Sequence, residues 1–275
     1  MSRVTIRSLH VYPMKGCRAI DVDSVEIIDG RIVGDRTLMM IDAAAGTFVS
    51  QRHLPSMARL VVDRSGQNLT FEDHHLRLTD LPPGPRRQVN VWGDVFDAQD
   101  LGDAPARVLS KWFDRDVRLV KLPTASPRAV DPFWTGGRDV RTSFADLAPV
   151  LVTNTASLDK VNRRREQAGE APIPMARFRP GIVVEGFDAF EEDRVRTLSA
   201  PGVTIELVKP CARCKVIELD PITGDVRRDG VLEGLASFRT FANARGTKGV
   251  MFGQNAIFIH ETPVRLSVGA ELTIG

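Results

Sequence analysis

Residues 209–225 read KPCARCKVIELDPITGD and hold two of the three cysteines of the chain, Cys211 and Cys214. Only two residues separate these thiols, and basic side chains surround them at Lys209, Arg213 and Lys215. A Cys-x-x-Cys pair can be half of a zinc site, a redox disulfide, or a place where one thiolate binds another group. The choice among these three chemistries decides what the segment does.

The surroundings of the cysteine pair favour the third chemistry. A structural zinc site takes four ligands, but the chain has no second Cys-x-x-Cys and its five histidines show no matching spacing. A thioredoxin-like pair begins at a helix N-terminus, whereas Pro210 precedes Cys211 here and KVIELD after Cys214 has the character of a strand. Cations favour thiolate, and a thiolate in a basic pocket suits a soft metal whose organic cofactor carries phosphate. Dithiol exchange and two structural cysteines stay as alternatives.

The composition is that of a globular protein without a strong overall electrostatic field. The chain has 275 residues, of which 43% are hydrophobic and 26% charged, and its formal net charge is +2. This length fits one large domain or two smaller ones. The charge balance argues against nucleic acid or a membrane surface as partner, so an anion site must be local.

The amino-acid composition also constrains the cellular location and the redox chemistry of the protein. There is no run of about 18 apolar residues and no signal-peptide core at the N-terminus, and three cysteines make no disulfide framework. We therefore expect a cytoplasmic protein. A ferredoxin-type cluster usually needs four cysteine ligands, so we expect no such cluster within this chain.

The first half of the chain reads as β-rich. In VTIRSLHVYP the alternation slips by one residue between Ile6 and Leu9, which predicts a β-bulge. Residues 58–73 predict a hairpin that turns near Ser65 and Gly66, and residues 87–100 predict another around Gly93 and Asp94. A helix is expected over 103–114 with Asp103 as cap, followed by a strand at 117–122.

The second half begins after a Pro- and Gly-rich stretch at 124–139, which predicts a domain boundary and divides the chain into 1–122 and 123–275. A strand followed by a helix is expected over 148–169, with Asn154 or Thr155 as cap, and a further helix over 231–241. Strands are expected at 180–186, 203–210, 215–220, 249–260 and 265–275. The predicted fold class is α+β, mainly β, with two β-rich lobes and a few helices.

Six blocks of the sequence resemble one known family. KPCARCKVIELDPITGD closely resembles the signature of the MOSC family, which is named after the C-terminal domain of molybdenum-cofactor sulfurases. HVYPMKGCRAI and GDRTLMMIDAAAGTFVSQR are similar to blocks of the β-barrel domain that precedes MOSC in one subgroup. FADLAPVLVTNTASLDKVN, RFRPGIVVEG and MFGQNAIFI resemble further blocks in the family's order. The resemblance implies an N-terminal β-barrel domain followed by a MOSC β-barrel domain.

The resemblance also implies a molybdenum–molybdopterin cofactor. Cys214 matches the cysteine that ligates molybdenum in the family, so it is expected to be both the metal ligand and the catalytic residue. Lys15 and Arg36 are expected to reach the cofactor across the domain seam. Gly16 replaces the family's usual serine and Ala19 its usual glycine. The full set of expected cofactor-binding residues is Lys15, Gly16, Arg36, Asp146, Thr153, Asn154, Arg179, Arg213 and Asn255.

The subgroup includes the mitochondrial amidoxime-reducing component and bacterial relatives, which implies a molybdenum-dependent oxidoreductase. Its expected substrates are N-hydroxylated small molecules, namely amidoximes, hydroxylamines and N-hydroxylated bases. Because no G-x-G-x-x-G follows a strand, electrons are expected from a separate ferredoxin or flavoprotein. One alternative is a carrier of the molybdenum cofactor or of sulfur without turnover of its own, and another is a dithiol redox protein. Cys17 is expected to be packed in a core, and the three tryptophans to be core or loop anchors.

Overall fold

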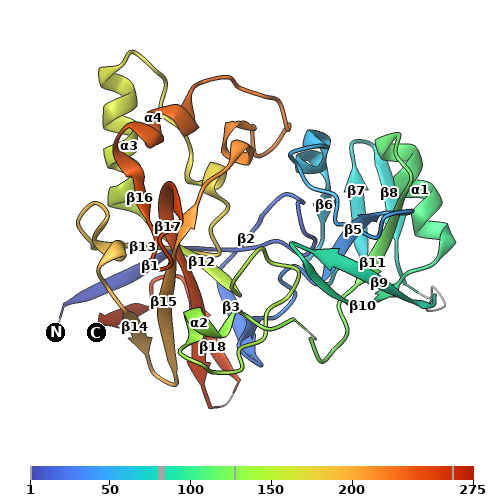
Figure 1. Cartoon of the computed structure of the whole chain (residues 1–275), viewed down its shortest axis with the longest axis horizontal. Helices are drawn as coiled ribbons and strands as arrows, with labels where there is room; N and C mark the ends of the chain where they lie inside the picture. Colours follow the sequence, from blue (N-terminus) through green and yellow to red (C-terminus); the bar gives the residue numbers. More distant parts are fainter. Residues whose placement is uncertain (1, 80–83, 127, 262) are drawn as a thin grey trace.

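The computed structural model describes residues 2–79, 84–126, 128–261 and 263–275. The chain forms two lobes that lie side by side along the long axis of the molecule (Figure 1). The larger lobe holds a closed barrel flanked by short helices, and the described part of the smaller lobe holds two short sheets, one α-helix and one 3₁₀ helix. The expectation of a mainly β fold with two β-rich lobes and a few helices is confirmed.

Within the described residues, seven strands close into the barrel of the larger lobe, because β12 pairs with both β13 and β17. In barrel order they are β12 (Val150–Asn154), β13 (Ile182–Glu185), β1 (Arg3–Val11), β19 (Glu271–Ile274), β14 (Thr197–Ala200), β15 (Val203–Ala212) and β17 (Lys248–His260). Two short strands extend the sheet, β2 (Ile20–Val22) beside β1 and β16 (Thr240–Ala242) beside β17. The inward-facing aliphatic side chains of these strands form one core.

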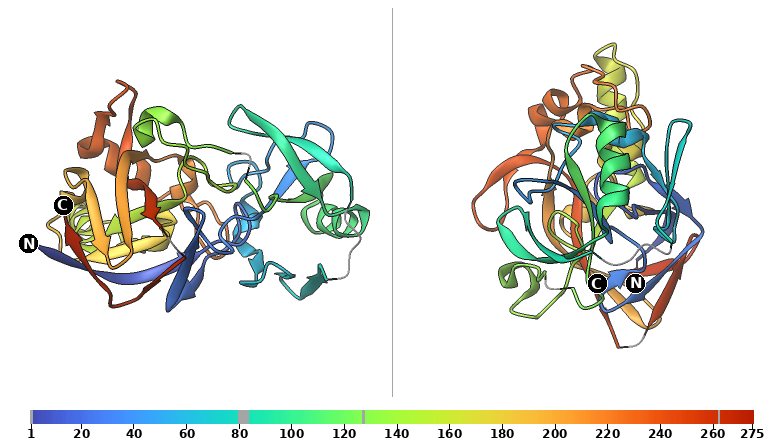
Figure 2. Two further views of the ribbon diagram at one scale, coloured as in Figure 1. Left: turned by 90° about the horizontal axis from the view of Figure 1, so that it is seen from below. Right: turned by 90° about the vertical axis from the view of Figure 1, so that its right-hand side faces the viewer.

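The first strand of the chain completes this barrel. β1 pairs with β13 on one side and with β19 on the other, so both termini lie on the larger lobe (Figure 2). The pairing with β13 shifts register between Ile6 and Ser8, which confirms the predicted bulge. The bulge lets Val4, Ile6, Leu9 and Val11 all reach the core despite the slip in alternation.

A further three-stranded sheet of β18 (Val264–Ser267), β3 (Ser24–Ile28) and β4 (Arg31–Ile32) adds Val25 and Ile27 to the barrel core. Residues 3–32 therefore pack largely with residues 150–274. The division of the chain at residue 122 stays a prediction. Part of the predicted boundary stretch, residue 127, lies outside the described residues.

The smaller lobe is built from the two predicted hairpins and the predicted helix. One sheet has the order β5 (Leu38–Asp42), β11 (Val117–Lys121), β10 (Asp94–Asp100) and β9 (Arg86–Val91), and the other consists of β6 (Val61–Val62), β7 (Asn68–Phe71) and β8 (His74–Arg77). Helix α1 (Asp103–Phe113) buries Leu109 and Phe113 in the core of this lobe, and the 3₁₀ helix η1 spans Pro55–Arg59. The expected capping by Asp103 is wrong, because Gly102 occupies the cap position and no side chain bonds there.

The remaining helices lie on the larger lobe. They are α2 (Pro132–Thr135), α3 (Thr155–Gln167), α4 (Val231–Arg239), η2 (Met175–Phe178), η3 (Glu191–Asp193) and η4 (Lys215–Glu218). The Asn154 carboxamide accepts the Ala156 N–H at 3.1 Å, which confirms Asn154 as a cap of α3. Within the described residues, no helix combines the length and apolar character that a membrane span requires.

The strand predicted at 215–220 is wrong, because η4 occupies this position. Two long-range hydrogen bonds hold the segment in its helical turn. Arg177 donates to the Ile217 carbonyl at 2.8 Å, and the Glu218 carboxylate accepts the Leu232 N–H at 2.6 Å. Ile217 is buried among side chains of α3 and α4, so its apolar character reflects tertiary packing and not a strand.

The loop that follows η4 fastens the two lobes together. Arg18 donates to the Ile222 carbonyl at 2.7 Å, and Arg59 donates to the Thr223 carbonyl at 2.9 Å. Gly224 has a φ of +77°, and a Cβ there would lie 2.3 Å from the Pro55 carbonyl oxygen. Only glycine fits this close approach, so the D-P-x-T-G part of the opening segment fixes the lobes relative to each other.

Candidate functional site

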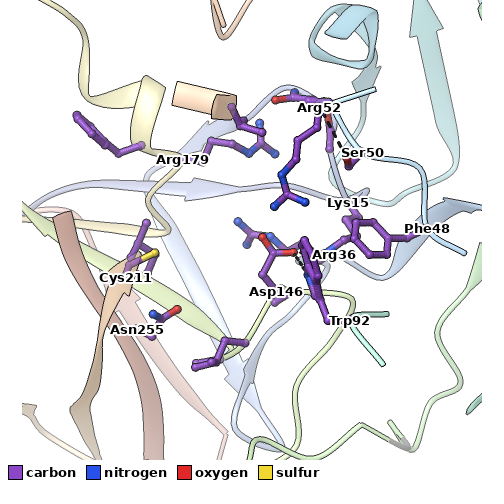
Figure 3. A pocket seen from close by; sticks show the side chains of 18 of the residues that line it. Lys15, Arg36, Phe48, Ser50, Arg52, Trp92, Asp146, Arg179, Cys211 and Asn255 are labelled. Carbon is purple, nitrogen blue, oxygen red and sulfur yellow. Dashed lines mark hydrogen bonds and ion pairs between the residues drawn. The ribbon is translucent and has the colours of Figure 1, made fainter. Parts of the chain in front are cut away.

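A cavity lies between the lobes and receives side chains from both (Figure 3). Figure 3 shows Cys211 and Asn255 on neighbouring strands of the barrel, and Lys15, Phe48 and Trp92 on the side of the smaller lobe. Seven of the nine expected cofactor-binding residues line this cavity: Lys15, Gly16, Arg36, Asp146, Arg179, Arg213 and Asn255. Residues from six separate parts of the sequence therefore meet at one place.

Lys15 and Asp146 form an ion pair in the cavity wall. Lys15 Nζ lies 2.5 Å from Asp146 Oδ1 and donates to the Phe144 carbonyl at 2.8 Å, while Trp92 Nε1 donates to Asp146 Oδ1 at 3.0 Å. Burial lowers the pKa of Lys15, and the neighbouring carboxylate opposes that shift. Desolvation by itself raises the pKa of Asp146, but Lys15 and Trp92 outweigh it and hold the pKa well below its usual range.

Tyr12, the one tyrosine of the chain, supports two cavity cations. The guanidinium carbons of Arg36 and Arg179 lie 4.4 and 4.3 Å from the centre of its ring. The ring is buried and its hydroxyl donates to the Pro180 carbonyl at 3.0 Å. Burial raises the pKa of Tyr12 to about 12 although both arginines lower it, so the phenol stays neutral. The neutral Tyr12 ring therefore contacts the guanidinium groups of both Arg36 and Arg179 and holds them at the same cavity.

The backbone at these two arginines is held in a sparsely populated conformation. Arg36 has a φ of +49° and Arg179 a φ of +54°, and both are non-glycine residues in the left-handed region. The Arg36 N–H donates to the Tyr12 carbonyl at 2.6 Å, and the Arg36 side chain pairs with the buried Asp35 at 2.5 Å. Each such conformation costs about 1–3 kcal/mol, and such strain is concentrated at functional sites.

Arg179 differs from Lys15, Arg36 and Arg213 in that its side chain has no polar partner among the described residues. Among the described residues its guanidinium makes no hydrogen bond or ion pair, and it lies over the Tyr12 ring. Burial lowers the pKa of Arg179, which reflects the penalty of a desolvated charge. A partly buried, uncompensated guanidinium beside a cavity is suited to bind an anion from outside the chain.

Arg213 turns toward the thiol pair. Its Nη1 donates to Cys211 Sγ at 3.0 Å and its Nη2 to the Phe178 carbonyl at 2.8 Å, while its buried Nε has no partner within the described structure. Cys211 lines the cavity. Cys214, the expected metal ligand, is not among the lining residues, although Arg213 and Val216 on either side of it are. Its half-buried thiol is free, in an extended residue that precedes η4.

Cys17 differs from Cys211 and Cys214 in its chemical environment. Its side chain is fully buried in the core of the smaller lobe, as expected, and burial raises the pKa of the thiol to about 11. The nearby Gly16 has a φ of +86°, and a Cβ there would lie 2.7 Å from Met57 Cε. The substitution of the family's serine by glycine thus coincides with a tightly packed turn.

Two expected residues do not reach the cavity. Thr153 and Asn154 are fully buried at the end of β12, where Asn154 caps α3 and also donates to the Asp188 carbonyl at 2.8 Å. Their neighbours Val150 and Leu151 line the cavity instead. The assignment of Thr153 and Asn154 to cofactor binding stays a prediction.

Sequence reasoning missed one wall of the cavity. This wall consists of Phe48, Ser50, Gln51, Arg52 and Trp92. Trp92 was expected to be a core or loop anchor, but it is 50% exposed in the hairpin turn between β9 and β10. Its ring lies 4.9 Å from that of Phe48, and the Arg52 guanidinium lies 4.5 Å above it. Two features of the sequence could have indicated this wall. They are the GTFVSQR block at residues 46–52 and the position of Trp92 beside Gly93 in the predicted hairpin turn.

The comparisons with known proteins agree with this architecture. Residues 3–116 match the MOSC N-terminal beta barrel domain, and residues 139–273 match the MOSC domain. The chain therefore belongs to the MOSC family, in the form that carries both domains, which confirms the resemblance.

Individual relatives bear more specific names. Over 96% of its length the chain is 28% identical to mitochondrial amidoxime-reducing component 1 of Homo sapiens and covers 81% of that protein. It is 28% identical to mitochondrial amidoxime reducing component 2 of Macaca fascicularis, with 86% of this chain and 72% of the relative covered. It is 23% identical to molybdenum cofactor sulfurase of Oryza sativa subsp. japonica over 92% of this chain, which covers 32% of that longer protein. MOSC domains are associated with the molybdenum cofactor, so these relatives support a function related to that cofactor.

Proposed function

We propose that this protein binds molybdenum–molybdopterin in the cavity between its lobes and reduces N-hydroxylated compounds, with electrons from a separate ferredoxin or flavoprotein. The observation that carries the proposal is the convergence of Lys15, Arg36, Arg179 and Arg213 on one cavity beside a free thiol pair. The names of the amidoxime-reducing relatives support the reaction class.

The cations of the cavity fit the phosphate of the pterin. A buried phosphate needs cations or aligned N–H donors. Lys15 and Arg36 already face the carboxylates Asp146 and Asp35, whereas Arg179 has no polar partner among the described residues. Arg179 is therefore the residue best placed to supply a two-pronged contact to phosphate oxygens, with Arg36 beside it on Tyr12.

The thiol pair fits the metal end of the cofactor. Within the described residues no three His, Cys, Asp or Glu side chains gather as a metal site, so the protein has few ligands of its own to offer here. A pterin dithiolene brings two sulfur ligands, and a single thiolate from the chain then suffices. Cys214 would be that thiolate, because it matches the molybdenum-ligating cysteine of the family signature and its half-buried thiol is free.

The bound group would supply the two-electron centre that takes the oxygen from the N–OH group, and the overall reaction consumes two electrons and two protons and releases water. The chain itself binds and orients. Asp146, whose pKa is depressed, stays ionised at neutral pH and can accept an N–H of a substrate at the cavity wall. Trp92 and Phe48 cover the adjoining side with aromatic surface.

The direct test is turnover. Cofactor-loaded protein should reduce benzamidoxime to benzamidine when a reduced viologen dye replaces the natural donor. If cofactor-loaded protein reduces no benzamidoxime with any electron donor, the proposed reductase activity is wrong. The similarity to molybdenum cofactor sulfurase favours a second candidate, a carrier of cofactor or sulfur, and a persulfide on Cys214 or Cys211 detected by mass spectrometry would support it.

A further inference from the structure

An apolar groove runs along the same seam between the lobes, next to the cavity. The larger lobe supplies the hydrocarbon of this groove through Leu219, Val226, Leu232, Ala236 and Val250. The smaller lobe supplies the opposite wall through Gln51, Arg52 and Pro55. Val226 is 57% exposed, so a large apolar side chain faces solvent here.

The groove and the cavity share a wall. Gln51 and Arg52 line both hollows. On the other side Lys215 lines the groove while the next residue, Val216, lines the cavity. The segment that begins at Cys214 therefore stands where the two hollows meet. A ligand long enough to lie in the groove would bring its end to this segment.

The walls of the groove are fixed before any ligand binds. The Gln51 side chain is buried and donates to the Gly16 carbonyl at 2.7 Å, and Arg52 stacks on Trp92. The bond from the Leu232 N–H to Glu218 holds the first turn of α4 against η4. The close approach of Gly224 to Pro55 fixes the distance between the lobes. A preformed apolar hollow binds ligands without an ordering penalty.

The two hollows differ sharply in polarity. The cavity presents the side chains of Lys15, Arg36, Asp146 and Arg179, whereas the surface of the groove is mostly apolar. The charged residues that also line the groove are Arg52, Lys215, Glu218, Arg228 and Glu233. The ligand that satisfies both is polar at one end and hydrocarbon at the other. A flat N-hydroxylated base has polar atoms along all its edges, so it would leave the apolar surface of the groove in contact with water.

We propose that the groove binds the apolar substituent of an N-hydroxylated substrate, so that its N–OH end points into the cavity beside Cys214. The substrate class is then amidoximes or hydroxylamines with an aliphatic body of several carbons, in preference to N-hydroxylated bases. This inference rests on the proposed reductase function for the orientation of the substrate. The binding of the hydrocarbon itself does not depend on turnover.

A series of straight-chain amidoximes from acetamidoxime to decanamidoxime tests the proposal. Kd is measured by calorimetry on cofactor-loaded protein, and kcat/KM with a reduced viologen dye. Affinity should rise by up to about fourfold per methylene until the groove is full. Ala236→Trp fills the groove and Val226→Asp places a charge in it, so both should abolish the dependence on chain length. Ser237→Trp adds the same ring at an exposed position of α4 that does not line the groove, and should keep the dependence.

The outcomes separate the groove from the reaction. If wild type binds short and long amidoximes equally, or if Ala236→Trp and Val226→Asp keep the dependence on chain length, the groove proposal is wrong even where all are reduced. If affinity rises with chain length and both variants lose this rise, the groove proposal holds even where no amidoxime is reduced. In that last case only the reductase function fails.

Discussion

Lys15 and Asp146 form an ion pair at 2.5 Å although 131 residues separate them in the sequence. The Lys15 side chain is only 9% exposed, whereas that of Asp146 is 69% exposed. The pair therefore joins a buried cation to a carboxylate at the cavity surface. It ties the Y-P-x-K segment of the smaller lobe to the segment that leads into the barrel strand β12.

Replacing Asp146 by Asn should lower the free energy of unfolding by about 1–2 kcal/mol, because Lys15 is left as a buried cation with only neutral partners. The pKa of Asp146 is depressed in the folded state, so its contribution is present above the ordinary carboxyl pKa of about 3.9 and is lost as the pH falls below it. Urea unfolding of wild type and variant should differ at neutral pH and converge in acid. Asp139→Asn, at an exposed pair, should change stability by less than about 0.5 kcal/mol. A difference that grows in acid would contradict the ion pair.

Arg179 is expected to bind the phosphate of the cofactor. Arg179→Ala should lower molybdopterin affinity about 10–100-fold, the equivalent of one charge-assisted contact of about 1.5–3 kcal/mol. Arg179→Lys should recover part of the loss, because it restores the charge but not the planar fork. Pterin content measured by fluorescence after oxidation gives the readout, and Arg163→Ala, an exposed arginine of α3, is the control. Equal pterin content in Arg179→Ala and wild type would remove Arg179 from the site.

The three thiols should differ in reactivity. In folded protein without cofactor, an alkylating reagent at about pH 8 should modify the half-buried Cys211 and Cys214 but not the fully buried Cys17, whose pKa is raised to about 11. Loading with cofactor should protect Cys214. Peptide mapping by mass spectrometry identifies each site. Modification of Cys17 at the rate of the other two, or no protection of Cys214, would contradict these assignments.

Gly224 should be the most sensitive glycine of the seam. Gly224→Ala places a methyl group against the Pro55 carbonyl, which adds about 1–3 kcal/mol of overpacking to the cost of a positive φ. Gly269→Ala is the matched control, because Gly269 also has a positive φ of +84° but a Cβ there meets nothing within 4 Å. Thermal and urea unfolding compare the two variants. Equal destabilisation would mean that the contact with Pro55 contributes nothing.

Local patterns predicted the local structure well. The two hairpins, helix α1 and the bulge in β1 follow from alternation, turn residues and spacing, which act over a few residues. The place of β1 in the barrel could not be read this way, because its partners β13 and β19 come more than 170 residues later. The strand predicted at 215–220 failed for a related reason, since bonds from Arg177 and Leu232 decide its conformation.

The sequence located the charged residues of the cavity but not the aromatic residues that hold them in place. The motif blocks located Lys15, Arg36, Arg179 and Arg213, and the fold brings all four to one cavity. The role of Tyr12 as a post for two arginines depends on segments that meet only in the folded chain. The same holds for Trp92, whose bond to Asp146 no local pattern reveals.

The most direct test of the account is the molybdenum and pterin content of wild type beside Cys214→Ser and Cys211→Ser, all purified from a molybdenum-replete host that makes the cofactor. We predict equimolar molybdenum and pterin in wild type, a loss of molybdenum in Cys214→Ser, and retention of most of it in Cys211→Ser. Wild-type protein without molybdenum, or full metal content in Cys214→Ser, would contradict the account.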